Sequence, residues 1–143
     1  MDAYSRRYFT TQIETANSRK LVTYLYDEAI RLLREARADL KEKRHGAASG
    51  KIGRTMDIVM ELANALDFTA SPQLASRLNA LYNFIVDGLV ESIRDRDPKR
   101  LRACEGLLAT LAEAWRHVTR PQPSLPPKID SNQYSRRTIA LSA

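Results

Sequence analysis

Few side chains in this chain have a type and spacing that suit chemistry. Glu42 and His45 form a Glu-x-x-His pair, the spacing used in bundles that hold two iron ions. Such sites need two of these pairs and two further inward glutamates. The other histidine, His117, has Ala114 three residues before it. The sequence therefore predicts no metal site and no cofactor.

Nucleophilic and phosphate-binding chemistry is equally poorly supported. Cys104 is the single cysteine and falls on an apolar helical stripe without a nearby histidine, which favours a buried apolar role over a nucleophile. Gly46, Gly50 and Gly53 fit no phosphate-loop spacing. We therefore expect no catalytic residues and no enzyme activity. Trp115 is interpreted as an anchor at the end of a helical bundle.

A run of basic residues offers a binding alternative to chemistry. Five of them recur at steps of three and four, which places them on one helix face: Arg31, Arg34, Arg37, Lys41 and Arg44. The net charge of +6 is compatible with a helical protein that binds nucleic acid. Glu35, Asp39 and Glu42 interleave with the basic residues, however, as on a solvated face. We therefore expect no nucleic-acid partner, and a steep salt dependence of binding would identify one.

The element that positions these residues is a helix over residues 21–40. One apolar stripe has the 3.6-residue helical period and comprises Leu21, Leu25, Ala29, Leu32, Ala36 and Leu40. A second stripe runs beside it and comprises Val22, Tyr26, Ile30 and Leu33. One neighbouring layer covers about a third of a helix circumference. The second stripe must therefore meet another helix or a partner chain.

Three more helices follow along the chain. Asn17 and Ser18 suit the start of the first helix, and the basic cluster followed by Gly46 marks its end. A second helix is expected from near Ser49, although Gly50 and Gly53 weaken its first turn. Ser71-Pro72 and Asp97-Pro98 are start signals for a third and a fourth helix. The third has the stripe Leu74, Leu78, Leu81, Ile85 and Leu89, and the fourth has Leu101, Cys104, Leu108, Leu111, Trp115 and Val118.

Four helices with short connections predict an all-α, antiparallel up-down four-helix bundle. We expect a lead-in segment at 1–17, the bundle at 18–120, and an extended or disordered proline-rich tail at 121–143. No run of about eighteen apolar residues occurs, so we expect no membrane insertion and a cytoplasmic protein. In the tail, residues 134–137 repeat the letters YSRR of residues 4–7. Chance and a weak competition with a partner are both open explanations.

Several stretches resemble the flagellin-specific export chaperones, the FliS family. They are LYDEAI in the first helix, RTMDIVMELANALD in the second, LNALYNFIVDGLVES in the third and GLLATLAEAW in the fourth. The likeness covers about residues 4–118 in the family's order. Ser18 stands where the family usually has proline, and Glu28 where it has the glycine of LYDG. Gly50 and Gly53 stand where it prefers good helix formers.

The resemblance implies a binding protein without catalysis. Family members hold the disordered C-terminal segment of flagellin along the outside of the bundle, prevent its polymerisation in the cytoplasm and present it to the flagellar type III export apparatus. The corresponding requirement is an apolar groove in which the partner folds. The residues expected to contact the partner are Tyr8, Ile13, Tyr26, Ile30, Leu33, Ile58, Leu62, Tyr82, Ile85 and Leu89.

Overall fold

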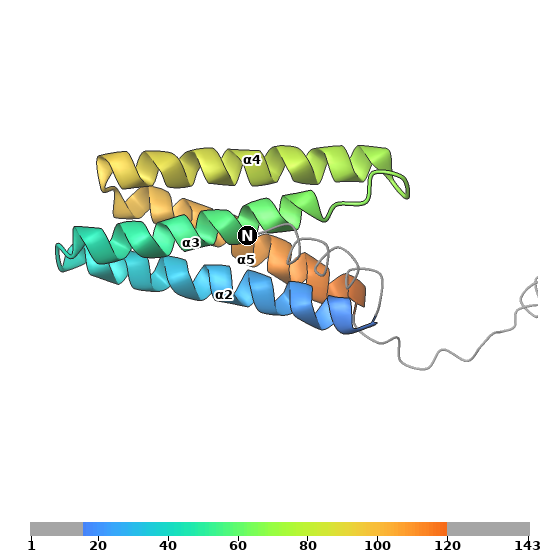
Figure 1. Cartoon of the computed structure of the whole chain (residues 1–143), viewed down its shortest axis with the longest axis horizontal. Coiled ribbons are helices and arrows are strands. Elements are labelled where there is room, and N and C mark those ends of the chain that lie inside the picture. Colours follow the sequence, from blue (N-terminus) through green and yellow to red (C-terminus); the bar gives the residue numbers. More distant parts are fainter. Residues whose placement is uncertain (1–15, 120–143) are drawn as a thin grey trace, which may run out of the picture.

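Four antiparallel helices make up most of the region that the computed structural model describes, residues 16–119. They are α2 (Ala16–Lys41), α3 (His45–Asn64), α4 (Pro72–Asp95) and α5 (Pro98–Thr119). Figure 1 shows each helix running back along the one before it. α2 and α4 each pack against both α3 and α5, which closes the four helices into a bundle. The predicted fold class is confirmed. The tail and residues 1–15 of the lead-in lie outside the described residues.

The starts of α4 and α5 follow local signals in the sequence. Both helices begin at the proline that the sequence indicated, because proline at the first helical position costs no backbone hydrogen bond. Asp97 caps α5 by accepting the backbone N–H of Lys99 on Oδ1 at 2.9 Å. In the 65–71 loop, Asp67 Oδ1 accepts the backbone N–H of Thr69 at 2.8 Å. These two carboxylates fix both connections of α4.

The end of α2 differs from the prediction. Lys43 takes the left-handed conformation, with φ of 61°, in place of a glycine. Its N–H donates to Leu40 O at 3.0 Å, and Arg44 N–H donates to Asp39 O at 2.8 Å. These two bonds form a Schellman motif, which satisfies carbonyls at a helix end. The expected marker, Gly46, instead lies inside the next helix.

Two expected helix starts are therefore corrected. α3 begins at His45, four residues before Ser49, and it includes the glycines that were expected to weaken its start. α2 begins at Ala16, which places Asn17 and Ser18 inside its first turn instead of before it. The periodic segments were predicted correctly, and only their boundaries moved, which is usual for helix ends.

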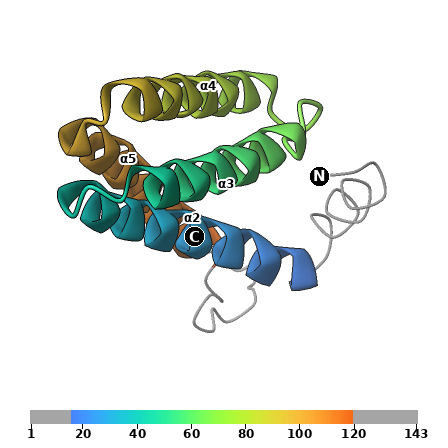
Figure 2. The same ribbon diagram turned by 60° about the vertical axis from the view of Figure 1, so that its left-hand side comes forward.

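The core runs the length of the bundle, and every helix contributes to it. Among its least exposed side chains are Leu33 of α2, Val59 of α3, Ile85 of α4 and Leu108 of α5. We call the end with turns 42–44 and 96–97 the turn end, and the end with the 65–71 loop the loop end. Figure 2 shows α5 crossing behind α2 and α3 as it leaves the turn end.

Candidate partner-binding surface

Most of the residues expected to line an outer groove lie in the core. Seven of them are less than a tenth exposed: Tyr26, Ile30, Leu33, Leu62, Tyr82, Ile85 and Leu89. The expectation that these side chains form an outer surface is therefore wrong. The physical reason is that α2 packs against α3 and α5 at once, and this uses both of its apolar stripes. Ile58 is half-buried against the core. Tyr8 and Ile13 lie outside the described residues.

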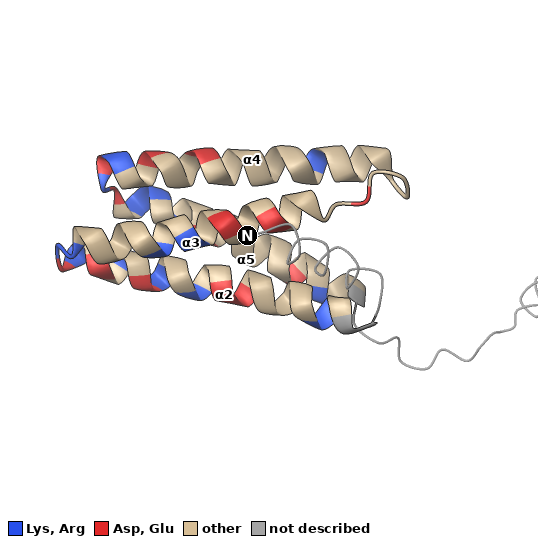
Figure 3. Ribbon diagram, in the orientation of Figure 1, with Lys and Arg blue, Asp and Glu red and all other residues tan. Residues whose placement is uncertain are grey.

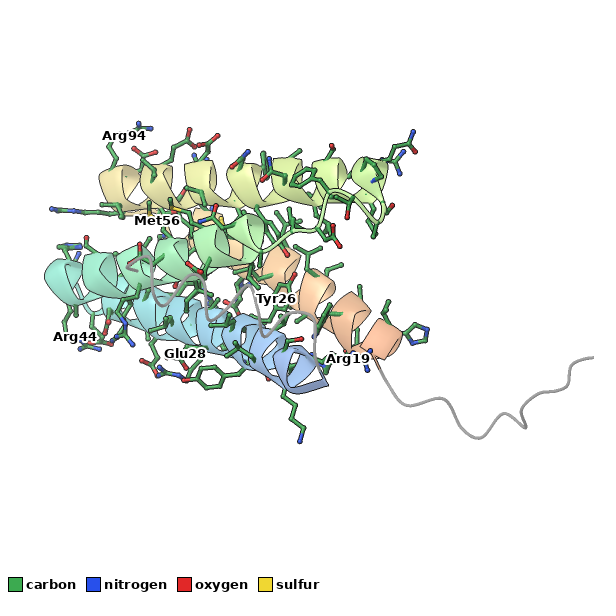
Figure 4. The ribbon with its side chains drawn as sticks, turned by 45° about the vertical axis from the view of Figure 1, so that its right-hand side comes forward. Arg19, Tyr26, Glu28, Arg44, Met56 and Arg94 are labelled. Carbon is green, nitrogen blue, oxygen red and sulfur yellow. The ribbon has the colours of Figure 1, made fainter. Side chains whose placement is uncertain are left out.

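The two tyrosines of this set meet inside the bundle. The hydroxyls of Tyr26 on α2 and Tyr82 on α4 are hydrogen-bonded at 2.5 Å. Figure 4 shows Tyr26 between the helices, whereas Arg44 lies at the α2–α3 turn. Burial raises the pKa of both phenols above their usual value. The pair links two diagonally placed helices through one polar contact, so each hydroxyl depends on the other.

A different set of apolar side chains is exposed. It follows the edge between α4 and α5, and we call it the apolar strip: the exposed Leu74, Leu81 and Phe84 from α4, with the exposed Val118 and the partly buried Leu107 and Leu111 from α5. Phe84 is 65% exposed and Val118 is 73% exposed. The sequence placed Leu74, Leu81 and Val118 on apolar helical stripes but did not indicate that they are exposed. Exposed apolar residues that share one edge indicate a binding surface more strongly than scattered ones.

Contacts near the turn end fix the register of the antiparallel α4–α5 pair. Near the turn end, Arg100 Nη1 lies 2.7 Å from Glu91 Oε1, and Cys104 Sγ lies 3.8 Å from Ile85 O. Leu81 and Leu74 precede Gly88, which lies against Cys104, by two and four helical turns. Leu111 and Val118 follow Cys104 by the same intervals. Because seven residues are almost two full turns, both rows begin on the facing sides of the two helices, which move apart towards the loop end as α5 crosses behind α2 and α3 (Figure 2).

At the loop end the bundle encloses an apolar pocket of about 270 Å³. Its walls come from all four helices and the 65–71 loop: Val22, Leu62, Ala65, Leu66, Asp67, Leu78, Tyr82 and Trp115. Leu62 and Tyr82 are the two expected site residues that line it. Leu78 lies on α4 between the first two residues of the apolar strip. The pocket and the strip therefore share the first turns of α4.

Trp115 holds this end of the bundle together. Its indole Nε1 donates to Thr23 Oγ1 at 3.1 Å and to the backbone oxygen of Arg19 at 3.3 Å, both on α2. Nearby, Arg116 of α5 pairs with Asp27 of α2 at 3.1 Å. These contacts with α2 agree with the interpretation of Trp115 as an anchor at the bundle end. Trp115 also lines the apolar pocket.

The basic run on α2 is largely occupied by carboxylates. Arg34 and Arg37 both bind Glu105 of α5, at 2.9 Å each. Arg31 pairs with two glutamates of its own helix, and Arg44 pairs with Asp39 at 3.0 Å. A nucleic-acid surface needs cations that are free to meet phosphates. Four of the five basic residues are instead used within the bundle.

The residues considered for catalysis or metal binding, Cys104 and the Glu42–His45 pair, show no arrangement suited to either role within residues 16–119. Cys104 is buried, and burial raises the pKa of its thiol, which fits the expected apolar role. Glu42 lies exposed in the turn end, next to α3, whose first residue is His45. Within residues 16–119, no three histidine, cysteine or acidic side chains gather where they could hold a metal ion. No helix in that range has the length and apolar character needed to span a membrane.

Comparison with known proteins identifies the family. The sequence profile described as "Flagellar protein FliS" matches residues 1–122. The chain belongs to the FliS family. Flagellar secretion chaperone FliS of Vibrio cholerae is 23% identical over 118 residues, which are 82% of this chain and 87% of that protein. Its counterpart in Salmonella typhimurium is 25% identical over the same shares.

A third FliS relative is similar over much the same length. Flagellar secretion chaperone FliSB of Pseudomonas aeruginosa is 26% identical over 115 residues, 80% of this chain and 91% of that protein. The family is one of chaperones and not of enzymes. The resemblance read from the sequence is confirmed. For this FliS protein the exposed apolar edge of α4 and α5, which periodicity alone did not single out, is the described surface best suited to a protein partner.

Proposed function

We propose that this protein is a cytoplasmic export chaperone that binds the disordered C-terminal segment of flagellin, prevents its premature polymerisation and delivers it to the flagellar type III export apparatus. Membership of the FliS family supports the proposal. The observation that carries it is the apolar strip, because a free chain that exposes phenylalanine, leucine and valine along one edge can cover them with a partner.

The shape of the surface favours a helical partner. Leu74 and Phe84 are ten residues apart on α4, which is about 15 Å at a rise of 1.5 Å per residue. An amphipathic helix of about three turns presents apolar side chains over that length at steps of three and four. One bulky side chain of the partner fits the pocket at the loop end, against Leu78 and Trp115. A disordered segment would fold as it binds.

Coupled folding has a measurable signature. A purified C-terminal flagellin segment should bind with one-to-one stoichiometry, a negative heat-capacity change and added far-UV helical ellipticity. Circular dichroism of the mixture, set against the sum of the separate spectra, measures the added helix. Additive spectra with no heat of mixing would reject the proposal for this partner.

Matched substitutions on α4 locate the binding surface. Leu81→Asp should weaken binding at least about tenfold, because burial of one such side chain is worth about 1.5–3 kcal/mol. Val90→Asp is the control, since Val90 is 46% exposed on α4 but is not part of the apolar strip. Isothermal titration calorimetry should show nearly unchanged binding for the control. Equal losses for the two variants would show that the strip is not the site.

A further inference from the structure

A second hollow lies at the turn end, away from the apolar strip. It has a volume of about 330 Å³ and is lined by Arg37, Lys41, Asp97, Pro98, Lys99 and Arg102. The residues come from the end of α2, the 96–97 turn and the first turns of α5. The lining includes α2, so the hollow lies on the side of α5 that faces α2, whereas the strip lies where α5 faces α4. Val22 of the apolar pocket and Lys41 are nineteen residues apart on α2, which is about 28 Å.

The charges around this hollow are unbalanced. Four of its residues are basic and one is acidic. The acidic residue, Asp97, already accepts the N–H of Lys99, and Arg37 is paired with Glu105. Lys41, Lys99 and Arg102 are exposed, and within residues 16–119 none of them has an ion-pair partner. The hollow is therefore a concentration of unneutralised positive charge, to which the start of α5 adds.

We propose that this hollow binds a carboxylate side chain in an acidic segment of a protein partner. The hollow combines ammonium and guanidinium heads with the ring of Pro98 and the aliphatic stems of the long basic side chains. A glutamate or aspartate side chain presents a charge at the tip of a short apolar stem, and this matches both features. A small hydrated anion would use only the charges.

The surroundings argue against an extended polyanion. Figure 3 shows acidic residues among the basic ones at the turn end. Asp95 lies just before the turn, and Glu105 lies one turn of α5 beyond the hollow. A nucleic-acid backbone carries a phosphate at every nucleotide and would pass close to these carboxylates. A short acidic segment can place one or two charges in the hollow and avoid them.

An NMR titration with hexaglutamate as the probe tests the proposal. Amide shifts should be confined to residues 41–44 and 97–102, and binding should weaken as salt is added. Lys99→Glu/Arg102→Glu should weaken hexaglutamate binding at least about tenfold, because two attractions become repulsions. Lys20→Glu/Arg77→Glu makes the same change in net charge on exposed residues near the loop end. This control should bind within about twofold of the unmodified protein.

Other probes and variants decide between the remaining outcomes. An equal loss in the control, or no localised shifts, would overturn the proposal. Inorganic phosphate that binds as tightly as hexaglutamate would show a small-anion site instead, and tighter binding of a single-stranded oligonucleotide would show a nucleic-acid site. Leu81→Asp should leave hexaglutamate binding unchanged. The flagellin proposal and this one can therefore fail separately.

Discussion

The edge between α2 and α3 and the edge between α4 and α5 are built in opposite ways. Across the first, Lys51 binds Asp39 at 2.6 Å and Arg54 approaches Glu28 at 3.7 Å, so charged side chains cover the apolar interior. Across the second, Arg100 pairs with Glu91 at 2.7 Å and approaches Asp95 at 3.9 Å, both near the turn end, and towards the loop end the edge is apolar and exposed. Figure 3 shows the same contrast, with few charges on the loop-end half of α4.

The difference between the two edges determines how much free energy each could gain by contact with another protein. An edge covered by paired charges gains little from another protein, because a partner would have to displace ion pairs that water already solvates well. An edge of exposed leucine, valine and phenylalanine gains roughly 25 cal/mol for each Å² of apolar surface that a partner covers. The bundle thus covers much of the α2–α3 edge with its own ion pairs and leaves apolar side chains exposed on the other edge.

The largest expected effect comes from the close approach of α4 and α5. A methyl group added at Gly88 would lie 2.9 Å from the buried Cys104 Sγ, whereas one added at Gly106 on α5 would meet no atom within 4 Å. Both substitutions to alanine bring the same gain in helix propensity. Gly88→Ala should therefore be less stable than Gly106→Ala by about 1–3 kcal/mol, the cost of overpacking. Urea denaturation followed by circular dichroism measures the difference.

A double variant shows whether the sulfur is the cause. Adding Cys104→Ala to Gly88→Ala removes the atom that the new methyl group would meet, so the two changes should cost less together than the sum of each alone. Simple additivity would mean that α4 and α5 are not in close contact here. The α4–α5 edge would then be looser along its whole length than the structure has it.

The fold was predictable from the sequence because helix periodicity and start signals are local. Pro72 and Pro98 each began a helix, and residues such as Leu33 and Leu108 belong to stripes that recur every three or four positions. Such patterns state that a residue faces something apolar. They do not state which helix or partner covers it, and that is why Ile30 was expected at a partner-binding groove although the bundle buries it.

The exposed strip left one faint signal in the sequence. The apolar residues of α4 are too many for a single stripe, since Phe84 falls between Leu81 and Ile85 and widens the apolar face. A helix at the corner of a bundle can bury such a face, as α2 does, or leave part of it exposed, as α4 does. The choice depends on how closely neighbouring helices approach, which is a tertiary property.

An intermediate effect is expected from the hydrogen bond between Tyr26 of α2 and Tyr82 of α4. Tyr82→Phe leaves the buried Tyr26 hydroxyl without its partner and should cost about 1–2 kcal/mol. Tyr26→Phe/Tyr82→Phe removes both hydroxyls and should recover part of that loss, as thermal unfolding would show. If the double variant were less stable than Tyr82→Phe by a further loss of similar size, each hydroxyl would have another role besides this contact.

The same pair predicts a response to alkaline pH. Burial raises the pKa of both phenols above the unfolded value of about 10, so the stability they contribute is fully present below pH 10 and is lost as the pH rises further. Between pH 9 and pH 11 the unmodified protein should lose more stability than Tyr26→Phe/Tyr82→Phe. Parallel losses would assign the alkaline effect to other groups.

The smallest expected effect on stability comes from the ion pairs of Asp39, and it can be measured only at acidic pH. The hydrogen bond from Lys51, assisted by Arg44, holds the pKa of Asp39 below its usual value. Its contribution is therefore present above the unfolded pKa of about 3.9 and is lost as the pH falls through the lower folded pKa. The free energy of unfolding of Asp39→Asn should therefore fall less steeply than that of the unmodified protein as the pH is lowered from about 4 to about 2.

Asp95 near the turn end, whose pKa Arg94 lowers, provides the comparison because its side chain is 39% exposed against 6% for Asp39. Salt screens exposed charges more strongly, so at high ionic strength the acid effect of Asp95→Asn should vanish while that of Asp39→Asn persists. If salt erased both effects equally, the α2–α3 edge would be no better covered than the turn beside α5.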